Sequence, residues 1–184
     1  MHLFKEQAAQ NLDAALAKIP LVDLGCYLGG KPGALKALAE KIKHACQTIG
    51  FFYIENHGVP QDLIDNTFLQ AARFHGLPLE SKTALSLDEN NIGYMPMNAS
   101  KQVHSTVHEA TTPNQNESFF ITHDRGPDHP DVLAGTPLRG TNYWPEGLPG
   151  FRESVMRYFK ALNKLGQSLV RPFSAALELS LIHI

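Results

Sequence analysis

One stretch of eleven residues, 50–60, most constrains the fold of this chain. It starts with a glycine where a helix would end, continues with four aromatic or β-branched residues, and closes with Asn56, His57, Gly58 and Pro60. Glycine ends helices, aromatic and β-branched residues favour strands, and Asn and Gly favour tight turns. The stretch therefore predicts a helix end, a strand at residues 51–54 covered on both faces, and a turn into a new helix.

Further elements are predicted on both sides of this stretch. Residues 19–24 and 117–121 are short apolar runs that suit strands, and Pro20 lies near a strand start, where a missing amide donor costs least. Apolar residues at steps of three and four predict helices near residues 3–16, 35–49, 63–75 and 155–177. Pro172 falls inside the last helix and predicts a kink near residues 168–172.

The composition is that of an ordinary soluble domain. The chain has 184 residues, of which 43% are hydrophobic and 18% charged, and its formal net charge is -2. No basic field exists to attract nucleic acid or anionic lipid. Two widely spaced cysteines favour a reducing compartment, and no segment has the roughly 20 apolar residues that span a bilayer. We therefore expect a cytoplasmic protein with neither a nucleic acid nor a membrane partner.

Several short motifs follow one another in a particular order. They are an Ile-Pro-led strand at 19–24, the stretch 50–60, Leu-Pro-x-Glu-x-Lys at 77–82, Gly93-Tyr94, Glu117-Ser118-Phe119 and Asn142-x-Trp144-Pro145. The order is more specific than any one motif. Together the motifs resemble the N-terminal region of the isopenicillin N synthase-like family, which consists of non-haem iron(II) oxygenases that mostly depend on 2-oxoglutarate.

This resemblance implies an α+β fold. The chain would be the helix-rich N-terminal region of a double-stranded β-helix, or jelly-roll, oxygenase whose catalytic barrel is largely absent from these residues. It would comprise an N-terminal domain at 1–121, a Gly/Pro-rich connection at 122–147, a long helix at 148–180 leading to the catalytic domain, and a non-native or truncated end at 181–184.

The family's iron site requires a His-x-Asp pair, a distant His and a later Arg-x-Ser. Two imidazoles and one carboxylate bind iron(II) on one side and leave positions open for co-substrate and oxygen. His129, Asp131 and His183 have similar spacing, but this pair precedes the Asn-x-Trp-Pro motif instead of following it. It also lies in a Gly/Pro-rich loop that cannot hold rigid ligand geometry. We therefore predict neither a metal ligand nor a catalytic residue in this chain.

Other residues are candidates for binding. By resemblance, Tyr94, Phe119 and Asn142 are predicted to contact substrate. His57 is interpreted as a hydrogen bonder that stabilises its turn. His104 and His108 are four residues apart, the spacing that zinc ligands take on one helical face, but only two ligands are evident and solvated histidines are favoured.

Three functional readings stay open. In the first, a complete parent protein uses iron(II) and 2-oxoglutarate to hydroxylate, desaturate or cyclise a small organic substrate. This chain alone is then inactive and binds neither cofactor tightly. It also self-associates through an uncovered apolar surface. In the second, the chain is a stand-alone binding module without catalysis. In the third, His129, Asp131 and His183 form a genuine metal site.

Overall fold

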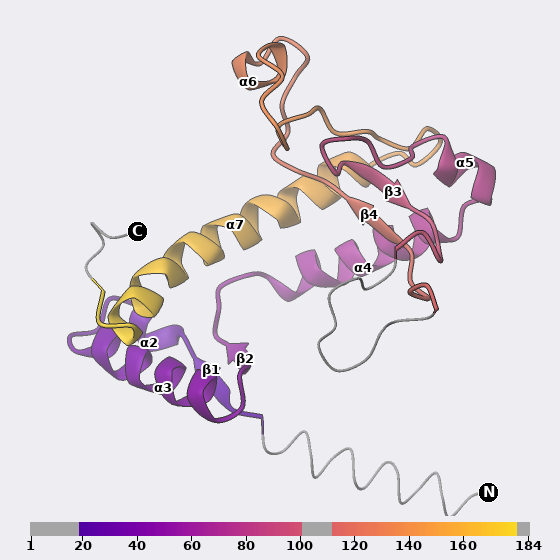
Figure 1. The fold of residues 1–184 in the computed structure, drawn as a ribbon. Helices are drawn as coiled ribbons and strands as arrows, with labels where there is room; N and C mark the ends of the chain where they lie inside the picture. The colour runs from indigo at the N-terminus through magenta and orange to yellow at the C-terminus, as the bar shows by residue number, and fades with distance from the viewer. Residues whose placement is uncertain (1–18, 101–111, 180–184) are drawn as a thin grey trace, which may run out of the picture. The chain divides into compact units, whose positions relative to one another are not determined.

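The computed structural model describes residues 19–100 and 112–179, which fall into two compact units (Figure 1). Of the described residues, unit 1 contains 19–61 and 159–179, and unit 2 contains 62–100 and 112–158. The helix predicted at 3–16 lies outside the described residues. The two units are defined only by how compactly their residues pack. The domain boundaries predicted after residues 121, 147 and 180 therefore stay predictions.

Unit 1 contains a two-stranded parallel sheet. Strand β1 (Leu21–Asp23) pairs with β2 (Tyr53–Glu55), and the connection between them carries α2 (Gly25–Leu28) and α3 (Ala34–Thr48). Parallel strands need such a crossover. Helix α3 ends where the sequence predicted, since Gly50 has a φ of 93° and its N–H donates to the Ala45 carbonyl at 3.0 Å. The left-handed conformation explains why a glycine follows this helix.

The core of unit 1 lies between the sheet, α3 and the C-terminal part of α7 (Phe151–Ala176). Helix α3 contributes Leu38 and Ile42, which are four residues apart and so share a face. The Tyr27 hydroxyl donates to the Ser168 carbonyl of α7 at 2.9 Å. The buried members of this core are Val22, Leu24, Leu38, Ala39, Ile42 and Ala176.

Within the described residues of unit 1, only one face of the β1–β2 sheet is covered. Val22 is 2% exposed, and its register partner Ile54 packs against the same core. On the other face Leu21 and Tyr53, also register partners, are 57% and 52% exposed. The strand predicted at residues 51–54 is found at Tyr53–Glu55, so it begins two residues later than predicted. Of the two covers predicted for it, the described part of the unit provides one.

Unit 2 combines short helices with a two-stranded antiparallel sheet. It holds most of α4 (Gln61–His75), then α5 (Leu79–Thr83), β3 (Gly93–Met95), β4 (Ser118–Phe120), α6 (Pro130–Leu133) and the first turns of α7. Strand β3 pairs with β4 so that Tyr94 lies opposite Phe119. Phe68 of α4 is 71% exposed.

The predicted fold class is confirmed. The described residues are helix-rich, with two small sheets and no closed barrel among them. Pro172 does lie within α7. None of the helices in the described part of the chain is both long and apolar enough to cross a membrane.

Gly93 generates a first prediction. Its φ is 116°, and a Cβ atom at this position would lie 2.6 Å from the Leu85 carbonyl oxygen. We expect Gly93→Ala to destabilise the protein by at least about 2 kcal/mol, since it adds both backbone strain and a backbone clash. Gly126→Ala is the matched control because a Cβ there meets nothing within 4 Å. Urea unfolding measures both, and equal midpoints for the two variants would contradict the prediction.

Candidate functional site

An aromatic cluster organises unit 2. Phe74 of α4 lies at its centre, with its ring centroid 4.4 Å from that of Phe119 and 5.7 Å from that of Phe151. Tyr94 reaches the same ring at 6.0 Å, and Trp144 packs on Phe151 at 6.3 Å. Aromatic pairs at such distances stabilise a core beyond the area that they bury. The cluster therefore joins α4, both strands of the sheet and the start of α7.

A charged group of four residues lies beside this cluster. The Glu117 carboxylate accepts hydrogen bonds from the Tyr94 hydroxyl and, at 2.9 Å, from the Lys82 ammonium. Lys82 also donates to the His75 carbonyl at 3.0 Å. His75 Nδ1 lies 3.0 Å from the second Glu117 oxygen, but the two are not aligned as a hydrogen bond, so we interpret this contact as electrostatic. We call His75, Lys82, Tyr94 and Glu117 the Glu117 cluster.

Contacts within the Glu117 cluster shift the pKa values of three of its groups. The hydrogen bond from Tyr94, followed by that from Lys82, lowers the pKa of Glu117 from 4.5 to about 2. Burial raises the pKa of Tyr94, and the hydrogen bond to Glu117 raises the pKa of Lys82. Near neutral pH the cluster therefore contains a carboxylate, an ammonium and a neutral phenol. None of these three is poised to exchange a proton, so Lys82, Tyr94 and Glu117 act as an anchor rather than as an acid or base.

The structure brings together two of the three predicted substrate contacts. Tyr94 and Phe119 are cross-strand partners that pack on Phe74. Tyr94 is 1% exposed and its hydroxyl is engaged by Glu117, whereas Phe119 is half-buried. Their contact with substrate stays a prediction.

Asn142 is engaged elsewhere. It is 5% exposed, and its side-chain amide accepts from the Thr122 N–H at 2.8 Å and donates to the Thr122 carbonyl at 2.9 Å. Both ends of the amide are thus used to hold the chain just after β4. Substrate contact by Asn142 also stays a prediction, and in this structure the side chain serves as a brace between two loops.

His129 and Asp131 lie at the start of α6. His129 is its N-cap, and His129 Nδ1 accepts a hydrogen bond from the Asp131 N–H at 3.2 Å. The Asp131 carboxylate lies 3.7 Å from Arg125 and 3.5 Å from Arg139. A capping imidazole and a carboxylate between two guanidinium groups do not form an open ligand pair. His183 lies outside the described residues, as do His104 and His108.

The described residues do not fit the iron that the resemblance implies. Among them, no three His, Cys, Asp or Glu side chains come close enough together to bind a metal ion. The donor set of an iron(II) oxygenase is therefore not found in the described part of the chain. His57 instead stabilises its turn as interpreted, with Nδ1 accepting from the Val59 N–H at 3.1 Å.

Fold and motif order together define the N-terminal region of a non-haem dioxygenase. A family model described as "non-haem dioxygenase in morphine synthesis N-terminal" matches residues 19–147, which is more than half of the chain. The chain therefore belongs to this family.

Characterised relatives support the same assignment. The chain is 36% identical over 158 residues to the 2-oxoglutarate-dependent dioxygenase caaD of Aspergillus niger, covering 83% of the chain and 46% of that protein. It is 33% identical over 166 residues to isopenicillin N synthase of Streptomyces clavuligerus, covering 88% and 48%. The predicted resemblance to the isopenicillin N synthase-like family is confirmed. The chain spans about half the length of the curated relatives that it matches.

Solved structures agree. The crystal structure of a full-length Neurospora crassa protein in complex with alpha-KG matches with a TM-score of 0.69 and 25% identity, covering 88% of this chain and 48% of that one. A putative 2OG-Fe(II) oxygenase family protein from Caulobacter crescentus matches with a TM-score of 0.66 and 20% identity, covering 89% and 50%, and shows the fold alone.

Sequence reasoning missed the Glu117 cluster. Lys82 and Glu117 each belong to a motif that the sequence displays, but they are separated by 35 positions. No periodicity connects the two motifs. The sequence therefore gives no signal that pairs Lys82 with Glu117. The burial of Lys82, which only the structure shows, is what indicates a paired lysine, because lysine is rarely buried without a partner.

The Glu117 cluster generates a second prediction. Glu117→Gln keeps the shape but leaves the Lys82 ammonium, whose side chain is 9% exposed, without its counter-charge. We expect a loss of about 2 kcal/mol, less than for a fully buried pair because the Glu117 side chain remains 23% exposed. Glu146→Gln, at an exposed carboxylate of the same unit, should change the stability by less than about 0.5 kcal/mol.

The pH dependence provides the second readout for this variant. Because folding lowers the pKa of Glu117, its contribution is complete above pH 4.5 and is lost as the pH falls toward about 2. The stability difference between wild type and Glu117→Gln should therefore shrink over this interval. A difference that stays constant there, measured by urea unfolding, would show that the Glu117 charge does not stabilise the fold.

Proposed function

We propose that this chain is the N-terminal part of an Fe(II)/2-oxoglutarate-dependent dioxygenase that hydroxylates, desaturates or cyclises a small organic substrate, and that the chain alone is inactive. The observation that carries the proposal is its match to such enzymes over 83–88% of its own length but only 46–48% of theirs. Relatives with this fold are named as 2-oxoglutarate-dependent enzymes. The cofactors would be held by the half of those relatives that this chain does not match.

The uncovered face of the β1–β2 sheet supports this proposal. Leu21 and Tyr53 lie opposite each other on that face, and both are more than half exposed. Phe51, just before β2, is 58% exposed. Burial of such side chains stabilises a protein by about 1.5–3 kcal/mol each. We propose that the C-terminal half of the parent covers this face, because the relatives are about twice the matched length.

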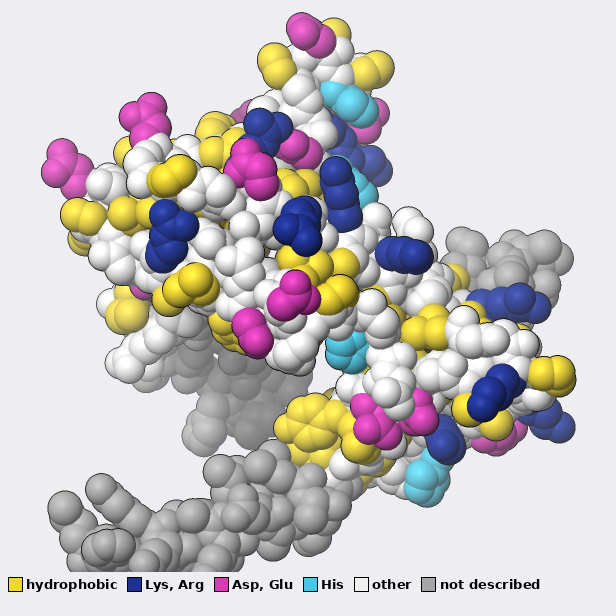
Figure 2. Space-filling view, turned by 180° about the vertical axis from the view of Figure 1, so that it is seen from behind, with side chains coloured by type: hydrophobic (Ala, Val, Ile, Leu, Met, Phe, Trp, Pro, Cys, Tyr) yellow, Lys and Arg dark blue, Asp and Glu magenta, His cyan; other side chains and the backbone are white. Residues whose placement is uncertain are grey.

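The charge of the chain bears on the partners of the parent protein. We propose a small-molecule substrate, a cytoplasmic location, and neither nucleic acid nor membrane as a partner. The net charge is -2. On the face drawn in Figure 2, Lys and Arg side chains mix with Asp and Glu side chains. The charges therefore do not add up to a positive field that would attract a polyanion or an acidic lipid surface.

A turnover assay tests the proposal. The 184-residue chain and a version extended by its downstream reading frame are each incubated with iron(II), ascorbate, oxygen, a panel of small organic substrates and 2-oxoglutarate labelled at C1. We expect labelled carbon dioxide from the extended protein, since the proposed reaction converts 2-oxoglutarate to succinate and carbon dioxide, and none from the 184-residue chain.

Two results would overturn it. Succinate formation by the 184-residue chain itself would show that the chain has a complete site. A downstream reading frame without His-x-Asp, a later His and Arg-x-Ser would remove the proposed parent enzyme.

The alternative proposal is a stand-alone binding module without catalysis. A surface hollow in unit 1, lined by Leu28, His57, Lys164 and neighbouring residues, favours it. Size-exclusion chromatography and binding of a hydrophobic dye separate the two proposals. If the chain is the N-terminal part of a dioxygenase, it should self-associate and bind dye through the Leu21–Tyr53 face. Uncovered apolar surface and free strand edges promote such association.

The Leu21→Lys/Tyr53→Lys double variant sharpens this comparison. It adds charge to the uncovered face without touching the core that contains Val22 and Ile54. It should restore a monomer and reduce dye binding. A wild-type chain that is already a compact monomer with little dye binding would instead favour the module.

A further inference from the structure

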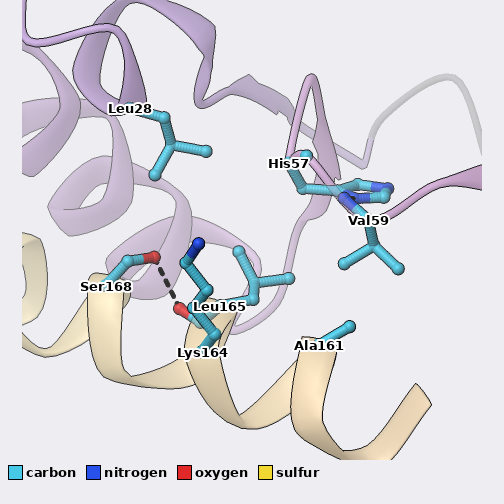
Figure 3. Close-up of a pocket in the computed structure, with 8 residues that line it drawn as sticks. Leu28, His57, Val59, Ala161, Lys164, Leu165 and Ser168 are labelled. Carbon is cyan, nitrogen blue, oxygen red and sulfur yellow. Dashed lines mark hydrogen bonds between the residues drawn. The ribbon is translucent and has the colours of Figure 1, made fainter. Parts of the chain in front are cut away.

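Two hollows in unit 1 differ in the arrangement of their polar groups. In the hollow drawn in Figure 3, the His57 ring points past Val59 and away from Lys164, so these polar groups do not converge on one ligand atom. The second hollow lies between α3 and the C-terminal end of α7, and its volume is about 340 Å³. We call it the α3–α7 hollow. The helices that form it are neighbours in the core of unit 1.

The α3–α7 hollow offers an apolar surface. Its two charged lining residues, Lys43 and Glu178, pair with each other at 2.6 Å. Phe173 and Leu177 also line it and are 36% and 65% exposed, and the free thiol of Cys46 is exposed as well. A charged ligand would find no unpaired counter-charge in the described lining. The hollow therefore suits an apolar side chain.

The chain enters unit 1 close to this hollow. The Tyr53 N–H donates to the Pro20 carbonyl at 2.9 Å, so Pro20 lies beside residues 52–53. The Phe52 ring packs on the Phe173 ring, with 6.4 Å between their centroids. The residues that precede Ile19 therefore join the unit within one ring contact of a side chain that lines the hollow.

The segment that precedes Ile19 has the composition to fill an apolar hollow. Residues 1–18 lie outside the described residues and outside the matched family model, which begins at residue 19. Their sequence predicts a helix whose apolar stripe includes Phe4, Ala8, Leu12 and Leu16. A helix of fewer than about 15 residues is marginal in water unless its apolar face packs on a surface. Leu16 is three residues from Ile19, a distance that extended chain spans with about 10 Å.

We propose that residues 3–16 dock on the α3–α7 hollow and that Leu16 fills it. Docking covers Phe173, Leu177 and the Cys46 thiol, so the N-terminal segment controls whether this thiol can react. The Lys43–Glu178 pair stays intact, because an apolar side chain requires no polar partner. This proposal does not depend on the oxygenase function, since it uses only the 184-residue chain.

The tether favours this segment over other occupants. A short flexible linker gives a docking segment an effective concentration in the millimolar range, which a second copy of the chain reaches only at millimolar protein. The exposed Leu21–Tyr53 face also lies near Ile19, and it is the surface proposed above for the C-terminal half of the parent protein.

Disulfide trapping tests the proposal in a Cys26→Ser background, where Cys46 is the only native thiol. Leu16→Cys should form a disulfide with Cys46 within one chain when oxidised glutathione is added, because such a bond needs Cα atoms within about 7 Å. Ala14→Cys is the matched control. It has a similar tether length but lies on the opposite face of the predicted helix, so its link should form about tenfold more slowly. Tryptic mass spectrometry identifies the linked peptides.

The reactivity of Cys46 provides a second measurement without any new thiol. In the same background, Leu16→Asp should raise the rate at which Ellman's reagent modifies Cys46 by about tenfold, the effect of losing one buried leucine. Ala14→Asp should leave this rate unchanged. Equal disulfide yields for the two cysteine variants, links formed only between two chains, or equal Cys46 rates for the two aspartate variants would each overturn the proposal.

Discussion

The short parallel pairing of β1 with β2 is the constraint on which the arrangement of unit 1 depends. Because side chains alternate along a strand, this register turns Val22 and Ile54 toward α3 and α7 and turns Leu21 and Tyr53 away. A slip by one residue would exchange the two sets. The apolar character of both sets is typical of a sheet that is buried on two sides, while the described residues provide only one of these layers.

Unit 2 is held together in a different way. Its sheet is also only two strands wide, and such a sheet is marginal without other packing. The Glu117 cluster and the Phe74 ring supply this packing, since they connect α4, α5, β3 and β4 by charge and by aromatic contact. The same contacts orient Tyr94 and Phe119 as neighbours. Glu117 therefore positions Tyr94 directly through a hydrogen bond, and Tyr94 in turn lies opposite Phe119.

Much of the fold could be predicted from local signals. The stripe on α3, the glycine at position 50 and the turn at Asn56 and Gly58 all depend on neighbours within a few residues, and each is found as expected. What failed depended on tertiary context. Sequence alone cannot say which face of residues 51–54 has a partner, and it cannot pair Lys82 with Glu117 across 35 positions. Motif resemblance located the segments of the candidate site but not the contacts between them.

The position of His129 and Asp131 shows why spacing alone does not define an iron site. Iron(II) ligands must be held by elements whose geometry does not change when the metal leaves, because a loose site gains little on binding. Here the imidazole caps a helix of four residues, and the carboxylate lies near Arg125 and Arg139. Binding of a metal ion by His129 and Asp131 would break the helix cap and leave the guanidinium groups of Arg125 and Arg139 without their anion. The contacts that stabilise this loop therefore oppose metal binding by His129 and Asp131.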